Sequence, residues 1–87
     1  MREHEVARVS EVKSRHEEEL LKKANVVAVG VGFREQSGRL TEQLCIVVSV
    51  RRKIKLAELD VKDVIPVDIE GVKVDVRETG EIHALGR

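Results

Sequence analysis

The chain has 87 residues, of which 37% are charged, and its 16 basic and 16 acidic side chains cancel to a formal net charge of +0. This length suits one domain, and balanced charge excludes the global field that recruits nucleic acid or a membrane surface. Aromatic residues make up 1% of the composition, so the large side chains that anchor many interfaces are nearly absent.

The first predicted element is an amphipathic helix within residues 1–24. Its apolar positions recur at steps of three and four, with charged residues between them. They form a stripe of Val6, Val9, Val12, His16 and Leu20. An imidazole on such a stripe predicts a histidine at the edge of the core or at a seam between copies. Asn25 is expected to end the helix as its C-terminal cap.

A strand is predicted over residues 26–33, which are rich in β-branched side chains. Because side chains alternate along a strand, two faces are expected. One face would carry Val27, Val29, Val31 and Phe33, and the other Val26, Ala28, Gly30 and Gly32. Turn-forming residues at 36–39 lead to a second strand over 44–53, so the two strands are predicted to form an antiparallel hairpin.

The second half of the chain predicts a short helical turn at 56–59 and another hairpin. Residues 67–69 and 72–76 alternate at period two around Glu70 and Gly71, which suit a compact turn. Pro66 excludes a central ladder position just before this hairpin. The predicted fold class is α+β, with the order α-β-β-α-β-β, a three- to four-stranded mainly antiparallel sheet, and one long helix packed on a face.

The domain organisation follows from these elements. We predict a single domain over residues 1–87, made of an amphipathic helix at 1–24, a sheet with a short helix at 25–79, and a tail at 80–87.

Gly30 and Gly32 raise the question of a phosphate-binding loop. Such a loop needs its glycines between a strand and the N-terminus of a helix, whereas these two lie inside a strand that turns into another strand. The sequence therefore favours glycines that allow close packing of the helix or of a neighbouring backbone.

No residue pattern predicts catalysis or a metal site. His4, His16 and His83 have no partner at metal-ligand spacing, and the serines have no triad context. Cys45, the only cysteine, lies in a Val/Ile-rich run and is expected to be a buried apolar residue. We therefore predict a protein that is not an enzyme and binds no cofactor and no metal.

A basic edge follows the second strand, and it supports a different hypothesis. Its members are Arg51, Arg52, Lys53 and Lys55. This edge leaves a small nucleic-acid-binding domain as the alternative function, although the aromatic side chains that usually stack on bases are missing around it. No apolar run approaches the length of a membrane span, so a cytoplasmic protein without a membrane partner is expected. The charge-rich composition also fits a thermophilic source.

Part of the sequence is similar to a known family. The similarity rests on the run from Asn25 to Arg34, on Ile46-Val47-Val48-Ser49-Val50, on Ile65-Pro66, and on Ile69-Glu70-Gly71-Val72. These segments resemble the N-terminal accessory region of bacterial trypsin-like peptidase-domain proteins, here without the protease domain. The resemblance implies an accessory module with a separate protease-like domain as a possible partner, and none of that family's catalytic residues has a counterpart in this chain.

The predicted function is a non-catalytic protein-interaction or assembly module, with self-association as the expected partnership. Two routes are open. Copies would meet either through the strand face of Val27, Val29, Val31 and Phe33, or through the helix stripe of Val6, Val9, Val12, His16 and Leu20. The second route predicts that protonation of His16 loosens the assembly. An enzyme whose site forms between subunits is a further alternative.

Overall fold

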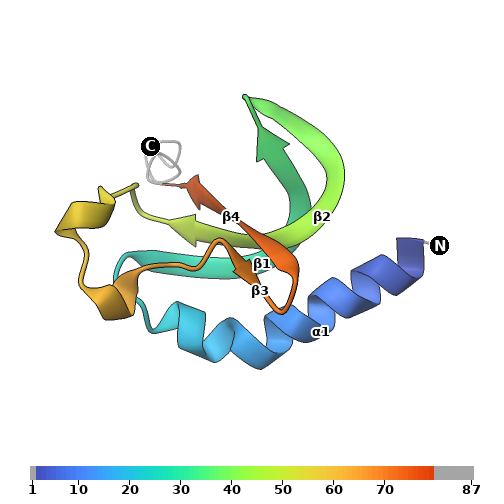
Figure 1. The fold of residues 1–87 in the computed structure, drawn as a ribbon, viewed down its shortest axis with the longest axis horizontal. Helices are drawn as coiled ribbons and strands as arrows, with labels where there is room; N and C mark the ends of the chain where they lie inside the picture. Colours follow the sequence, from blue (N-terminus) through green and yellow to red (C-terminus); the bar gives the residue numbers. More distant parts are fainter. Residues whose placement is uncertain (1, 80–87) are drawn as a thin grey trace, which may run out of the picture.

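A computed structural model describes residues 2–79, which form one long helix packed on a four-stranded mixed sheet (Figure 1). The elements in chain order are helix α1 (Arg2–Leu21), strands β1 (Val26–Gln36) and β2 (Arg39–Val50), the 3-10 turns η1 (Leu56–Glu58) and η2 (Val61–Asp63), and strands β3 (Asp68–Ile69) and β4 (Val72–Glu78). This arrangement confirms the predicted α+β class. The predicted tail at 80–87 lies outside the described residues.

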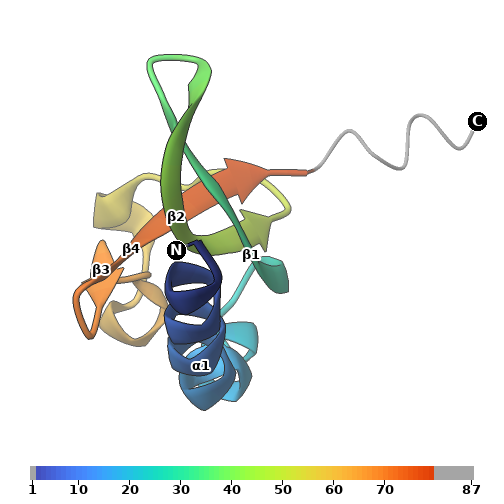
Figure 2. The same cartoon turned by 90° about the vertical axis from the view of Figure 1, so that its right-hand side faces the viewer.

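Helix α1 packs its apolar stripe against the sheet, as the periodicity predicts. Val9, Val12 and Leu20 are buried, with exposed fractions of 6%, 1% and 2%. The helix covers one face of the sheet, while the far end of the β1–β2 hairpin rises away from it (Figures 1 and 2). The α1 stripe is therefore used inside the fold of a single chain.

Strand β2 supplies the centre of the core. Ile46 and Val48 have no exposed surface, and Val50 is 3% exposed. These side chains alternate along β2 on the face that meets α1, so their burial follows from period two. Partly buried side chains surround them: Val26, Val29, Leu44, Ile65, Ile69, Val74 and Val76.

Both predicted hairpin turns are present. Ser37 and Gly38 have φ angles of 54° and 79°, and Glu70 and Gly71 have φ angles of 52° and 83°. Two consecutive residues with positive φ match the twist of flanking antiparallel strands, which explains the tight reversals.

The centre of the sheet is parallel, which the hairpin pattern did not predict. Strands β2 and β4 pair in parallel from Ile46 with Val74 to Val50 with Glu78, while the β1–β2 and β3–β4 pairs are antiparallel. A hairpin determines pairing only within itself. Residues 51–67 cross over to bring β4 back in the direction of β2, and a connection of about a dozen residues is sufficient for that.

The short helical turn predicted at 56–59 is present as the 3-10 turn η1, and a second 3-10 turn, η2, follows it. Leu59 and Asp60, with ψ angles of 143° and 149°, are extended and separate η1 from η2. Each of these 3-10 turns contains only three residues, so neither forms a second α-helix. The described chain therefore has one α-helix followed by four strands.

A polar latch ties the β3–β4 turn to α1. Arg15 donates to the Glu70 carboxylate from Nε at 3.3 Å and from Nη2 at 2.6 Å, and His16 Nε2 lies 2.8 Å from the same group. Arg8 donates to the Glu70 backbone carbonyl at 2.8 Å. Hydrogen bonding by Arg15, followed by that of His16, lowers the pKa of Glu70 from its ordinary value of 4.5 to about 2.

The lowered pKa of Glu70 makes the latch pH-dependent. Because folding lowers this pKa, the contribution to stability is complete above about pH 4.5 and is lost as the pH falls towards about 2. We expect E70Q to be less stable than the wild type near pH 7, and the difference to disappear at about pH 2. Urea unfolding over this pH range measures the effect. If the stability difference between E70Q and the wild type kept its size at low pH, the role given to the Glu70 carboxylate would be contradicted.

The control for this experiment is E58Q. Glu58 is exposed in η1, and its side chain makes no ion pair with the described residues. E58Q therefore removes one negative charge and breaks no ion pair. Its stability near pH 7 should lie within about 0.5 kcal/mol of the wild type.

Candidate functional site

The two edges of the sheet differ in how they are protected. Strand β3 forms one edge, contains two residues and follows shortly after Pro66, so it offers little backbone for pairing. Strand β1 forms the other edge, has 11 residues, and carries no charged residue between positions 26 and 33. Proteins usually protect a long edge with charge, proline or a covering segment. The outer edge of β1 is therefore the candidate interaction site.

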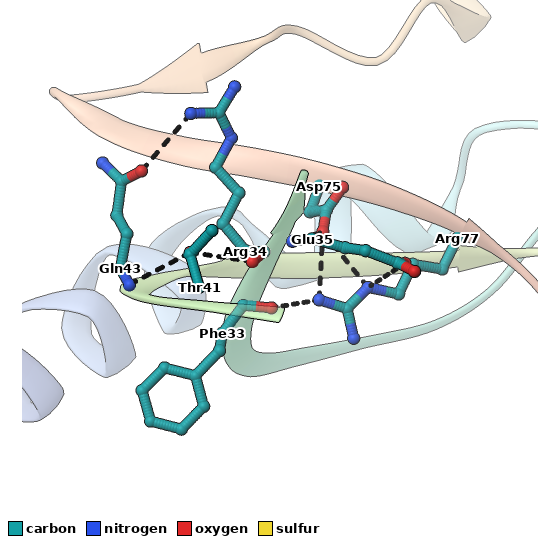
Figure 3. A network of polar contacts seen from close by, with 7 residues as sticks. All are labelled: Phe33, Arg34, Glu35, Thr41, Gln43, Asp75 and Arg77. Carbon is teal, nitrogen blue, oxygen red and sulfur yellow. Dashed lines mark hydrogen bonds and ion pairs between the residues drawn. The ribbon is translucent and has the colours of Figure 1, made fainter. Parts of the chain in front are cut away.

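A side-chain clasp occupies the far end of this edge (Figure 3). Asp75 Oδ2 accepts a hydrogen bond from the Glu35 backbone N–H at 2.8 Å, and Arg77 Nη2 donates to the Phe33 carbonyl. Arg77 also donates to Asp75 Oδ2 from Nε at 3.1 Å and from Nη2 at 3.0 Å. Two charged side chains of β4 thus bind edge groups of β1 that a further strand would otherwise bind.

Nearer its start, the β1 edge keeps backbone groups that no other described strand binds. Backbone groups of alternate residues point the same way along a strand, so Val29 and Val31 share the outward direction of the Phe33 carbonyl. The flanking side chains are partly open: Val27, Val31 and Phe33 are 45%, 37% and 40% exposed. This segment combines accessible backbone with exposed apolar side chains.

A β-bulge changes the predicted faces of β1. Val26 pairs with Val50 and Ala28 pairs with Ser49, so Val27 is the extra residue between them. Val26 consequently shares the helix-covered face with Val29, and the prediction that put Val27 on the same face as Val29 is wrong. The bulge leaves Val27 on the outside at the start of the open segment.

The glycines do not serve the role that was predicted for them. A Cβ atom on Gly30 would meet no atom within 4 Å, and one on Gly32 would lie 3.1 Å from Val47 Cγ2. Both pair with β2 residues on the face away from α1, so close approach of the helix is wrong as an explanation. On that face the hairpin curls towards Asp75 and Arg77, and small residues permit such a bend.

The helix stripe is not available as a seam between copies. Val9, Val12 and Leu20 are buried under the sheet and Val29 packs against the same core, while Val6 is 42% exposed. His16 lies at the edge of the core in the Glu70 latch, with 29% of its side chain exposed. The helix stripe therefore cannot serve as the second predicted route to self-association. Among the predicted interface residues of the sheet, Val27, Val31 and Phe33 are exposed.

Sequence reasoning missed the clasp and a cavity. The alternation in the second hairpin assigned no role to Asp75 or Arg77, whose side chains are only 17% and 29% exposed. The cavity, of about 220 Å³, opens between the end of β2 and the 3-10 turns, and Arg52 and Lys53 of the basic edge line it. Cys45 is buried as expected, and burial raises the pKa of its thiol.

Two further observations concern residues 2–79 only. Within this range no three His, Cys, Asp or Glu residues are grouped so as to hold a metal ion. None of the helices in the described part is long and apolar enough to cross a membrane. The predictions of no cofactor and no catalysis remain predictions.

A protein-family model described as the NARROW LEAF 1 N-terminal domain matches residues 9–77. No curated protein matches the chain. The match overturns the resemblance to the N-terminal region of bacterial trypsin-like peptidase-domain proteins, because the segments that carried it fall almost entirely within the range matched by a different family. Val-rich strands suit many half-buried sheets, which explains the earlier similarity. The protease-like partner implied by it loses its support.

The glycine environments predict opposite responses to alanine. Gly30→Ala adds a methyl group in open space and reduces the freedom of the unfolded chain, so we expect a gain in stability of about 0.4–1 kcal/mol. Gly32→Ala forces Val47 to move and should give less stability than Gly30→Ala. Thermal unfolding of both variants compares them directly. If Gly30→Ala lost more stability than Gly32→Ala, the surroundings of these two glycines in β1 would differ from those described above.

The clasp predicts a measurable role for Arg77. R77A leaves the Phe33 carbonyl and the half-buried Asp75 carboxylate without this donor, so we expect a loss of about 1–3 kcal/mol. Hydrogen exchange at the Glu35 amide should accelerate as the clasp loosens. K73A, an exposed change on the same face of β4, is the control and should have little effect. Equal stability losses in the two variants would contradict a specific clasp.

Proposed function

We propose that this chain, which belongs to the NARROW LEAF 1 N-terminal domain family, is a non-catalytic assembly module that self-associates through β1. In the described part of the chain, β1 forms an edge of the sheet whose first part is not covered. The observation that carries the proposal is the contrast between the two edges of the sheet. The β3 edge is short, whereas the β1 edge is long and has an uncharged stretch. An edge of this second kind is a template for adding a strand.

A second copy suits the open part of β1 chemically. An antiparallel two-fold pairing centred on Val29 would bring Val31 of each copy against the start of the other copy's β1, where its exposed side chain would be covered. Positions 26–33 carry no charge, so no like charges would oppose one another in the paired segment. Such pairing would join the two sheets through backbone groups of Val29 and Val31.

Nucleic-acid binding has less support as the function. The only aromatic residue, Phe33, lies in β1, whereas Arg51 and Lys55 follow the end of β2 in the crossover segment. A basic cluster without aromatic neighbours offers phosphate contacts and no stacking platform.

The proposal predicts that a charge on the edge prevents assembly. V31K places an ammonium group where two copies would meet, and we expect it to weaken self-association at least about tenfold, measured by sedimentation equilibrium at micromolar concentration. V61K introduces the same charge at a position that is 90% exposed in η2 and should leave association unchanged. The wild-type assembly should be the same at pH 5 and pH 8, since His16 is engaged within one chain.

Two outcomes would contradict the proposal. One is a wild-type chain that stays monomeric up to about millimolar concentration, because the free edge would then have too little affinity for a second copy. The other is an equal loss of association in V31K and V61K, which would locate the interface elsewhere.

A further inference from the structure

The cavity between the end of β2 and the 3-10 turns has an apolar interior and a basic mouth. We propose that it binds a small aliphatic carboxylate, with the hydrocarbon tail inside and the carboxylate at the mouth. This site is separate from the β1 edge and does not depend on self-association.

The interior is built from the end of the core. Val50, which is 3% exposed, and the partly buried Ile65 and Val76 supply apolar walls. The 3-10 segment adds Leu56, which is 68% exposed at this site and would be covered by an apolar ligand. An apolar cavity of about 150 Å³ is enough to hold benzene. The volume of about 220 Å³ therefore accepts a short aliphatic tail.

The mouth carries two cations that are open to a ligand. Arg52 and Lys53 line the cavity and are exposed, and the structure gives neither side chain an ion pair within residues 2–79. Asn25 Nδ2 donates to the Arg52 carbonyl, so the backbone that presents the guanidinium is tied down. A guanidinium donates two parallel hydrogen bonds to a carboxylate, which favours an anionic head group at this position.

The acidic groups beside the mouth already accept hydrogen bonds from the backbone. Asp63 Oδ1 accepts from the Ala24 N–H at 2.9 Å, and Glu78 Oε2 accepts from the Lys53 N–H at 2.8 Å. These hydrogen bonds fix the positions of both carboxylates relative to the backbone. Asp63 also lines the cavity and keeps its negative charge, so Arg52 and Lys53 together leave one net positive charge for a ligand to meet.

Hexanoate is the probe for this site, with hexan-1-ol as its neutral analogue of equal tail length. We expect hexanoate to bind saturably, to shift the amide resonances of Val50, Ile54 and Ile65 in ¹H–¹⁵N spectra, and to bind about tenfold more tightly than hexan-1-ol. R52Q should remove most of this preference for the carboxylate. R51Q is the matched control, because Arg51 is an exposed neighbour that does not line the cavity. The melting temperatures of the two variants establish that both are folded.

Several results would overturn the proposal. They are equal affinity for hexanoate and hexan-1-ol, equal weakening of hexanoate binding by R51Q and R52Q, and shifts confined to amides away from the cavity. Tighter binding of acetyl-Val-Leu, whose carboxylate ends a peptide, would assign the site to a protein C-terminus instead. None of these results bears on self-association, since V31K and V61K test that separately.

Discussion

The packing of α1 on the middle of β2 is the contact on which the rest of the structure depends. Val12 and Leu20 on the helix meet a sheet face that includes Ile46 and Val48, and all four are at most 2% exposed. Each such side chain contributes roughly 1.5–3 kcal/mol when it is taken out of water. A chain of 87 residues has a single core, so the positions of β1, β4 and the crossover segment follow from this contact.

Because α1 covers one face, the other face has to be closed by different means. The β1–β2 hairpin bends over it, with Gly30 and Gly32 on the side towards which it bends. Asp75 and Arg77 then bind backbone groups of Phe33 and Glu35. The clasp acts as a side-chain substitute for a fifth strand at the far end of β1, and it ends where the uncharged stretch begins.

The same arrangement explains why the two candidate binding features lie in different places. The β1 edge is open near Val29 and Val31 because the clasp satisfies only its far end. The cavity forms where the crossover segment leaves β2 and passes the core with two 3-10 turns instead of a longer helix. One feature presents backbone for pairing, and the other presents an apolar interior beside two cations.

The sequence by itself determined what depends on neighbouring residues. The period of the stripe from Val6 to Leu20 predicted a helix and its buried face, and alternation predicted the core positions of β2. The glycine-containing turns at 37–38 and 70–71 determined both hairpins, since positive φ is a local property of the backbone.

Only the tertiary structure decided how these units meet. The parallel pairing of β2 with β4, the contact of Glu35 with Asp75 and that of Phe33 with Arg77 join residues 28 to 44 positions apart in the chain. The bulge at Val27 reversed a face assignment because one extra residue shifts a period of two. Local periodicity carries no information on such long-range pairings, which are selected by the packing of the complete core.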